Sequence, residues 1–275
     1  MSSYPNERFL VTTDWLAAHL NDPELRIIDP RGAGRYAEGH IGGSVNLPVA
    51  RLDDPAAPIR STLLPAERFG VLAGNLGIRN TDTIVIYDDG PGLMAGRTFW
   101  ALEYFGHEKL ALVNGGIAAW IAEGRPLVTQ PTAPTATVYK AVTHAERGAT
   151  KEEVRSRLEQ AGAVILDVRS KDEYTGAVAQ AFRGGHVPGA KSLEWSEALT
   201  PGNLPMFKPA DDLKRQFEGA GVAAGKEVIT YCQGGIRAAH SYFVLRLMGF
   251  DNVRNYSGSW GDWGNDPSFP VEQGS

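Results

Sequence analysis

The chain carries one ordered set of short segments twice, and this duplication constrains the fold more strongly than any other feature of the sequence. An Asp-x-Arg segment near the start of each half is followed by a Gly-His-x-x-Gly segment. Because the matches keep their order over most of both halves, we expect two copies of one structural unit. The first-half segments are 27–31, 39–43, 84–88 and 114–120, and their counterparts are 165–169, 185–189, 228–232 and 257–263.

The length of the chain agrees with two copies. A chain of 275 residues suits two domains of roughly 100–150 residues each. The stretch between the copies is rich in Pro and Thr and poor in large apolar side chains, which is typical of a linker. We therefore predict a first domain over residues 1–126, a linker over 127–139 and a second domain over 140–275.

Hydrophobic runs and capping signals in the second half predict the elements of the unit. Thr150 and Glu153 occupy the two positions of a capping box, so we expect a helix to begin at Lys151. The other predicted elements are strands 163–167 and 227–231 and helices 211–218 and 237–248. Strands that are apolar throughout and alternate with helices indicate a parallel sheet covered on both faces. The expected fold class is α/β, built twice.

The overall charge argues against several classes of partner. The sequence has 27 basic and 32 acidic residues, a net charge of −5, so nothing attracts it to nucleic acid or to an anionic membrane. It has no apolar run of about eighteen residues that would span a bilayer, and its start lacks the apolar stretch of a secretory signal. We expect a cytoplasmic protein whose partners are small molecules or proteins.

The single cysteine, Cys232, excludes an internal disulfide and a thiolate zinc cluster, and we expect no metal. Most free cysteines are buried small hydrophobic residues, so a reactive role needs support from the surroundings. Here Cys232 directly follows the predicted strand 227–231. In parallel sheets this carboxyl edge is where ligands bind.

The loop after Cys232 predicts an anion-binding turn. Gly234 and Gly235 permit backbone angles that let successive N–H groups converge on one point. The start of the next helix and Arg237 add positive charge, which favours the thiolate. The alternative, a tight turn with Cys232 as filler, leaves the conjunction of cysteine, glycine pair and arginine unexplained. The backbone N–H groups expected to hold the anion belong to Gln233, Gly234, Gly235, Ile236 and Arg237.

These motifs together resemble the tandem-domain rhodanese family, which includes thiosulfate and 3-mercaptopyruvate sulfurtransferases. The resemblance covers nearly the whole chain and implies two rhodanese-like domains, the first an inactive copy with Asp88 in the place of Cys232. It also implies double displacement: the Cys232 thiolate takes the outer sulfur of a donor, keeps it as a persulfide and passes it to a nucleophile. The resemblance implies no metal or organic cofactor.

Related phosphatases share this type of loop, but their cysteine and arginine are separated by five residues. Only four residues separate Cys232 and Arg237, so the smaller loop fits a sulfur atom better than a tetrahedral phosphate. The sequence also offers no obvious general acid for a leaving alcohol. Phosphoryl transfer is therefore disfavoured.

The sequence departs from the resembling family beside the site. Glu173 stands where these enzymes usually have an arginine that binds the anionic donor. We expect Arg183, in the loop before the second Gly-His segment, to supply the missing charge. Among the tryptophans, Trp195 is the best candidate for lining the cleft, whereas Trp260 and Trp263 are expected in the core.

Residues that recur in the half without a cysteine are expected to have structural roles. The histidine of the Gly-His segments, His186 and its copy, falls in this class, as do the aspartate and arginine of the two Asp-x-Arg segments. The recurring residues are His40, His186, Asp29, Arg31, Asp167 and Arg169.

Four functions remain open on the sequence. The first is a sulfurtransferase that uses thiosulfate as donor and cyanide or a thiol as acceptor. The second uses 3-mercaptopyruvate as donor. The third is a persulfide carrier that receives sulfur from a partner protein, and the fourth is an inert duplicated scaffold in which Cys232 is unreactive.

Overall fold

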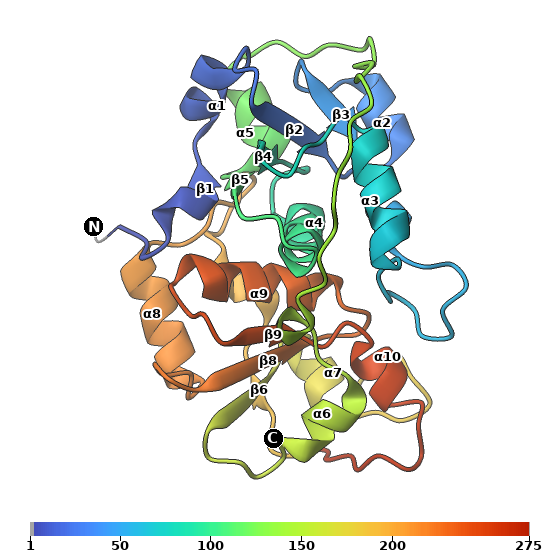
Figure 1. Ribbon diagram of the computed structural model, residues 1–275. Helices are drawn as coiled ribbons and strands as arrows, with labels where there is room; N and C mark the ends of the chain where they lie inside the picture. The colour runs from blue at the N-terminus through green and yellow to red at the C-terminus, as the bar shows by residue number, and fades with distance from the viewer. Residues whose placement is uncertain (1–2, 275) are drawn as a thin grey trace.

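The computed structural model describes residues 3–274, which form two α/β domains joined by an extended segment (Figure 1). Each domain contains one parallel sheet with helices on both faces, as the sequence predicts. The first sheet has the strand order β1-β5-β4-β2-β3, and the second has the order β7-β6-β8-β9. The strands are β1 (Leu10–Val11), β2 (Leu25–Asp29), β3 (Ser44–Asn46), β4 (Thr83–Ile86), β5 (Leu110–Val113), β6 (Ala163–Asp167), β7 (Lys191–Ser192), β8 (Glu227–Tyr231) and β9 (Val253–Asn255).

Because β2 to β5 correspond in order to β6 to β9, the two sheets repeat one topology, and β1 is an addition at the edge of the first. The helices follow the same repeat. They are α1 (Thr13–His19), α2 (Ala33–Glu38), α3 (Ala66–Asn75), α4 (Leu93–Tyr104), α5 (Gly116–Ala122), α6 (Lys151–Ser156), α7 (Lys171–Thr175), α8 (Ala210–Gly219), α9 (Ile236–Leu247) and α10 (Ser259–Trp263). Within residues 3–274 there are also four short 3-10 helices: η1 (Glu7–Phe9), η2 (Val49–Leu52), η3 (Ala145–Arg147) and η4 (Trp195–Ala198).

The local predictions for the second domain are confirmed. Strands β6 and β8 have the predicted bounds and pair in parallel along their whole length. At the start of α6 the Thr150 hydroxyl accepts from the Glu153 N–H, and the Glu153 carboxylate accepts from the Thr150 N–H. These two bonds satisfy N–H groups that have no partner inside the helix.

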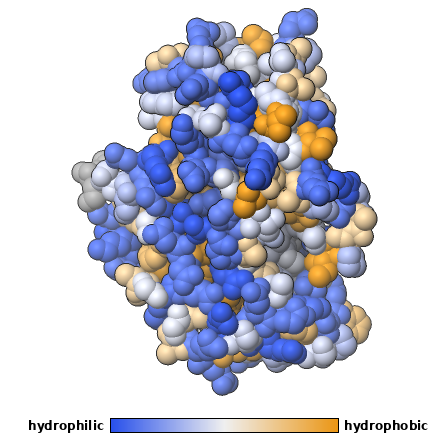
Figure 2. Space-filling view, viewed as in Figure 1, coloured by the Kyte–Doolittle hydropathy of each residue, from blue (hydrophilic) through white to orange (hydrophobic). Residues whose placement is uncertain are grey.

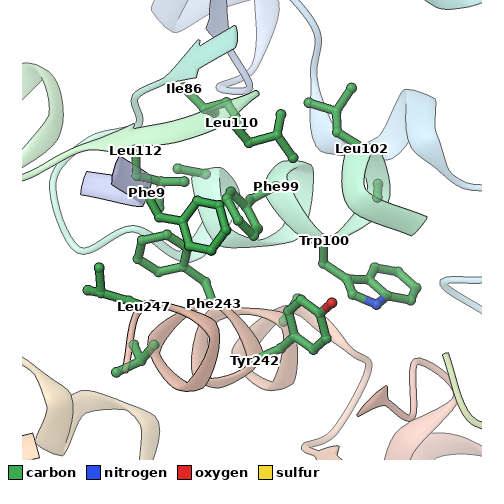
Figure 3. Packing of buried hydrophobic residues seen from close by; sticks show 14 of the residues in the cluster. Phe9, Ile86, Phe99, Trp100, Leu102, Leu110, Leu112, Tyr242, Phe243 and Leu247 are labelled. Atoms are coloured by element: carbon green, nitrogen blue, oxygen red, sulfur yellow. The ribbon is translucent and has the colours of Figure 1, made fainter. Parts of the chain in front are cut away.

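Helices α4 and α9, each of which follows a central strand, meet between the domains (Figure 1; Figure 3). Phe99 of α4 packs edge-on against Phe9 and against Phe243 of α9, with ring centroids 5.1 and 5.0 Å apart. The backbones approach so closely that a Cβ at Gly96 would lie 2.9 Å from the His240 Cα. One hydrophobic cluster therefore continues from one domain into the other and holds the two domains together.

An extended segment connects the domains and runs down one side of the first (Figure 1). Residues 129–144 contain no helix or strand. Val128 exchanges two backbone hydrogen bonds with His40, and Thr137 donates to the Gly74 carbonyl. A Cβ at Gly74 would lie only 2.5 Å from the Thr137 oxygen, so the segment is closely packed on the first domain.

The face of the molecule in Figure 2 is predominantly hydrophilic, with hydrophobic residues scattered over it. The apolar side chains instead fill the space between the sheets and their helices. Among residues 3–274, no helix combines the length and apolar character needed to cross a membrane.

Candidate active site

Cys232 directly follows β8 at the carboxyl end of the second sheet, and its side chain is buried. Three residues later, Gly235 turns the chain into α9 with a φ of 83°. This left-handed conformation favours glycine, and an added Cβ would lie 2.7 Å from the Ser257 carbonyl oxygen. The loop between strand and helix therefore depends on glycine at this position.

The loop directs the backbone N–H of Gly235 toward the sulfur. The Gly235 N–H lies 3.1 Å from the Cys232 Sγ, and the Ser259 hydroxyl lies 3.9 Å from it. Ser259 also accepts from the Cys232 N–H, while the Trp260 N–H donates to the Cys232 carbonyl. The first residues of α10 thus hold the backbone of Cys232 in place. The N-terminus of α9 adds partial positive charge near the sulfur.

Arg237, in the first turn of α9, forms a bidentate ion pair with Glu173 of α7 at 2.6 and 2.8 Å. Burial by itself raises the pKa of Glu173, but its hydrogen bonds to Arg237 and the charge of that guanidinium lower it below the ordinary value. The same hydrogen bonds raise the pKa of Arg237, with a further contribution from the negative charge of Cys232. Arg237 therefore pairs with the Glu173 carboxylate and also lies within electrostatic reach of Cys232.

Arg183 does not compensate for Glu173, and that prediction is wrong. Its guanidinium donates to backbone carbonyls of the C-terminal segment, at 3.2 Å to Gly264, 2.7 Å to Phe269 and 3.0 Å to Trp263, and it also contacts the Asp266 carbonyl. These four backbone acceptors lie at the end of α10 and in the segment that follows it. Arg183 thus joins this segment to the loop before His186.

Trp195 lies in η4 and is half-buried, with its ring edge-on to His240 of α9 at 5.2 Å between centroids. A contact between this tryptophan and substrate stays a prediction. Trp260 and Trp263 are fully buried in the second-domain core, as expected.

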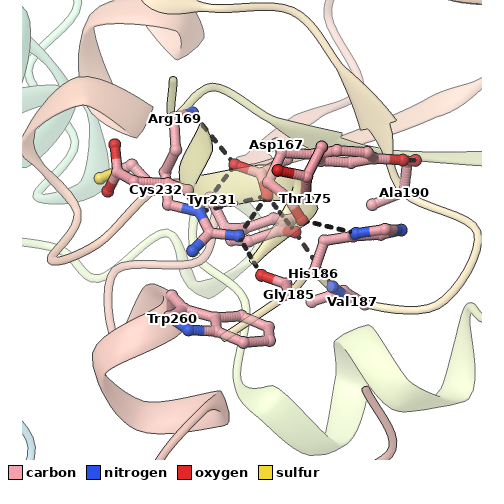
Figure 4. A network of polar contacts seen from close by, with 12 residues as sticks. Asp167, Arg169, Thr175, Gly185, His186, Val187, Ala190, Tyr231, Cys232 and Trp260 are labelled. Carbon is pink, nitrogen blue, oxygen red and sulfur yellow. Dashed lines mark hydrogen bonds and ion pairs between the residues drawn. The ribbon is translucent and has the colours of Figure 1, made fainter. Parts of the chain in front are cut away.

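A buried polar network supports the strand that carries Cys232 (Figure 4). Arg169 donates to Asp167 at 2.6 and 3.0 Å, and the Tyr231 hydroxyl donates to the same carboxylate at 2.5 Å. Burial and the charge of Asp167 together raise the pKa of Tyr231. His186 stacks on Tyr174 with its centroid 3.7 Å away and bonds the Tyr174 carbonyl.

The first domain repeats this network without a cysteine nearby. Arg31 donates to Asp29 at 2.6 and 2.9 Å, and His40 stacks on Tyr36 at 3.7 Å. The prediction of structural ion pairs and packed histidines is therefore confirmed in both halves.

In the first domain, Asp88 takes the place of Cys232 and fills its own loop. Its buried carboxylate accepts four backbone N–H bonds, from Gly90 and Gly92 at 2.9 and 3.0 Å and from Met94 and Ala95 at 2.9 and 3.2 Å. Burial raises the pKa of Asp88, and the four bonds oppose that rise. A loop of this type can therefore bind an anion with backbone groups alone.

A family model described as the rhodanese-like domain matches residues 12–123 and 150–266. The chain belongs to the rhodanese-like family. Thiosulfate sulfurtransferases from Azotobacter vinelandii and Pseudomonas aeruginosa are each 38% identical to it. The match with the Azotobacter vinelandii protein covers 94% of this chain and 94% of that protein. The match with the Pseudomonas aeruginosa protein covers 99% of this chain and 100% of that protein.

Two further rhodanese relatives carry different descriptions. A Thermus thermophilus protein described as the sulfur carrier protein TtuD is 34% identical, covering 98% of this chain and 99% of its own length. The crystal structure of the 3-mercaptopyruvate sulfurtransferase SseA from Escherichia coli is 31% identical, with a TM-score of 0.83 over 92% of this chain and 98% of that one.

Two residues near the rhodanese site escaped the sequence analysis because they belong to the first domain. The Ser61 hydroxyl donates to the Gly234 carbonyl of the cysteine loop at 2.7 Å. Arg97 of α4 is fully buried and donates to Ser257, Ser61 and Asp53. One feature of the sequence could have indicated Arg97: it is the one basic residue in α4, in a mainly apolar stretch. A buried charge needs partners, so such an arginine predicts polar contacts with another segment.

A cleft of about 790 Å³ lies beside the loop and is walled by both rhodanese domains. Gln233 and Gly234 form the wall on the second-domain side, and residues 58–61 form the opposite wall. The Gln233 amide donates to the Gln180 carbonyl, which joins the loop to a third segment at the rim. The space is larger than a small inorganic donor needs.

Proposed function

We propose that this chain is a thiosulfate sulfurtransferase that carries sulfane sulfur as a persulfide on Cys232 and passes it to cyanide or a thiol. The proposal rests on the Gly235 N–H, which points at the Cys232 Sγ. Arg237, two residues later, places a positive charge near the same sulfur. The names of the relatives with 38% identity over nearly the whole chain support thiosulfate as the donor.

The reaction has two displacement steps. The Cys232 thiolate attacks the outer sulfur of thiosulfate, a new sulfur–sulfur bond forms, and sulfite leaves with the electron pair of the old one. The acceptor nucleophile then attacks the outer sulfur of the persulfide and releases the thiolate unchanged. Neither step needs a metal, an organic cofactor or an external oxidant.

The loop stabilises negative charge at each stage. The thiolate, the persulfide anion and the transition states between them all place charge where the Gly235 N–H and the start of α9 point. The Asp88 loop provides an internal comparison, because there a carboxylate is held by four backbone N–H groups. We propose that a bound sulfur anion draws comparable N–H groups of residues 233–237 toward itself.

A persulfide carrier is the second candidate, and the Glu173–Arg237 pair favours it. The carboxylate neutralises much of the charge that a small dianionic donor would use, so sulfur delivered from another protein meets less repulsion. The relative described as a sulfur carrier is in line with this alternative. Either way, we place the reaction in the cytoplasm, where a lone thiol stays reduced.

The test is cyanide-dependent thiocyanate release with thiosulfate or 3-mercaptopyruvate as donor, comparing the wild-type chain with Cys232→Ser. Turnover with thiosulfate that the serine variant loses supports the proposal. Preference for 3-mercaptopyruvate would replace the donor, and the SseA relative makes that comparison necessary. If neither donor gives turnover although Cys232 reacts with iodoacetamide, the carrier function replaces the enzyme.

A further inference from the structure

One peptide unit of the cysteine loop is bound at both ends. The N–H of the Gly234–Gly235 peptide points to the Cys232 Sγ at 3.1 Å, and its carbonyl accepts from the Ser61 hydroxyl at 2.7 Å. Because a trans peptide is planar, with its N–H and C=O pointing in opposite directions, fixing the carbonyl also fixes the direction of the N–H. A hydrogen bond at the carbonyl also polarises the peptide and strengthens the bond at the N–H.

Ser61 adopts an unusual backbone conformation to make this contact. Its φ is 63°, a left-handed value that is uncommon for residues other than glycine. Its own carbonyl accepts two hydrogen bonds, from Arg97 and from the Ser257 hydroxyl, both at 2.7 Å. Such conformations persist where the surroundings hold them in place, and they often mark functional sites.

Arg97 links these contacts to the far side of the loop. Its guanidinium is fully buried, pairs with Asp53 at 2.8 Å and donates to the Ser257 hydroxyl at 2.7 Å. Ser257 in turn lies directly against Gly235, where a Cβ would meet its carbonyl oxygen at 2.7 Å. The contacts therefore form a closed ring of Gly234, Ser61, Arg97, Ser257 and Gly235, which crosses from one domain to the other.

We infer that Ser61 and Arg97 are positioning residues through which the cysteine-free first domain aims the Gly235 N–H at the sulfur of Cys232. This inference rests on the proposed function, in which that sulfur becomes the persulfide. The first domain then has a direct part in the reaction although it carries no nucleophile. Neither residue donates a hydrogen bond to the sulfur. Ser61 acts on the Gly234–Gly235 peptide, and Arg97 holds Ser61 and Ser257 in place.

Two substitutions test the inference. Ser61→Gly removes the hydroxyl but suits the left-handed φ, so it adds no backbone strain. Arg97→Lys keeps the charge but cannot reach Ser257, Asp53 and the Ser61 carbonyl at once. We measure kcat and KM for thiosulfate and the rate of Cys232 alkylation by iodoacetamide across pH. We expect kcat to fall about tenfold in each variant, with KM changed less than about twofold. The midpoint of the alkylation profile should rise.

Glu103→Gln is the matched control. Glu103 of the first domain binds Arg246 and Tyr242 of α9, at 2.8 and 2.5 Å, so the substitution weakens the domain interface without touching the cysteine loop. It should leave the alkylation profile in place. An unchanged profile and kcat in Ser61→Gly would overturn the inference, as would an equal shift in Glu103→Gln. Alkylation needs no sulfur donor, so it still tests the positioning role if no donor forms a persulfide and the proposed function fails.

Discussion

The two domains form corresponding loops after corresponding strands, β4 and β8, yet they fill them in different ways. In the first domain the Asp88 carboxylate occupies the loop and receives four backbone N–H bonds. In the second domain Cys232 receives one, from Gly235. The first loop is also longer by one residue, with 89–92 between Asp88 and α4 against 233–235 between Cys232 and α9.

This difference separates anion binding from sulfur chemistry. A carboxylate that is part of the chain satisfies the N–H groups permanently, so the first loop has no vacancy and no nucleophile. A cysteine brings a single sulfur, and on the proposed function we expect further N–H groups of its loop to bind the additional charge of a persulfide. The shared ion pairs Asp29–Arg31 and Asp167–Arg169 show that the support beneath the two loops is the same.

Making the second loop resemble the first should abolish the reaction. Cys232→Asp places a carboxylate where the sulfur lies, so thiocyanate release should fall by at least about a thousandfold because no sulfur nucleophile remains. The fold should survive, since the loop already favours an anion. Circular dichroism and a thermal melt check folding beside the activity assay. Residual turnover above a hundredth of the wild-type rate would show that Cys232 is not the carrier.

The two helices at the interface differ at matching positions, since Arg97 and His240 each stand five residues after the helix-capping glycine. Burial lowers the pKa of His240 to about 4. As pH falls from about 6.5 to about 4, His240 takes up a proton in the unfolded chain but not in the folded one. The free energy of unfolding therefore falls over this pH range. We expect His240 to contribute about 3 kcal/mol to this loss.

His240→Phe, which keeps an aromatic ring between Trp195 and Phe207, should flatten this part of the stability profile. Urea unfolding at pH 7, 5.5 and 4.5 measures it, and identical slopes in the variant and the wild type would contradict the assignment.

Emptying the first loop should cost stability rather than activity. Asp88→Ala leaves four backbone N–H groups without their acceptor, and we expect the free energy of unfolding to drop by about 2 kcal/mol. Because the loop would then be a vacant anion site, added sulfate should restore more stability to the variant than to the wild type. Thermal melts with and without sulfate measure both effects. Equal gains in the two proteins would refute the view of this loop as an occupied anion site.

What the sequence could predict follows the distance between partners along the chain. Asp167 and Arg169 are two residues apart on one strand end, and the capping box at Thr150 spans one helical turn, so local patterns suffice. The cysteine loop is likewise continuous in sequence. By contrast, Arg237 and Glu173 belong to different helices, so their ion pair could not be predicted from a local pattern. The sequence favoured Arg183 instead, because it lies nearer to Glu173 along the chain. Ser61 reaches Gly234 only because α4 and α9 dock the domains together.

The smallest predicted effect is on the binding of a free anion, the sulfur donor, near the loop of the second domain. In the first domain the loop carboxylate is itself the ligand, whereas in the second Arg237 is paired with Glu173. On the proposed function, we expect an incoming donor to compete with Glu173 for Arg237. Glu173→Gln releases this guanidinium and removes a negative charge, so the KM for thiosulfate should fall about threefold. Turnover at saturating donor should change little, because the Gly235 N–H is unaffected.

The pH profile of stability gives the same substitution a second readout. The folded chain holds the pKa of Glu173 below its unfolded value, so the pair stabilises the protein above about pH 4.3. That contribution is lost as pH falls through the lowered pKa. Glu173→Gln should therefore weaken the acid sensitivity of unfolding below about pH 4.3 while improving donor binding. A KM that rises in the variant would mean that Glu173 orients Arg237 for the donor rather than competing with it, and the charge argument for a carrier would lose its basis.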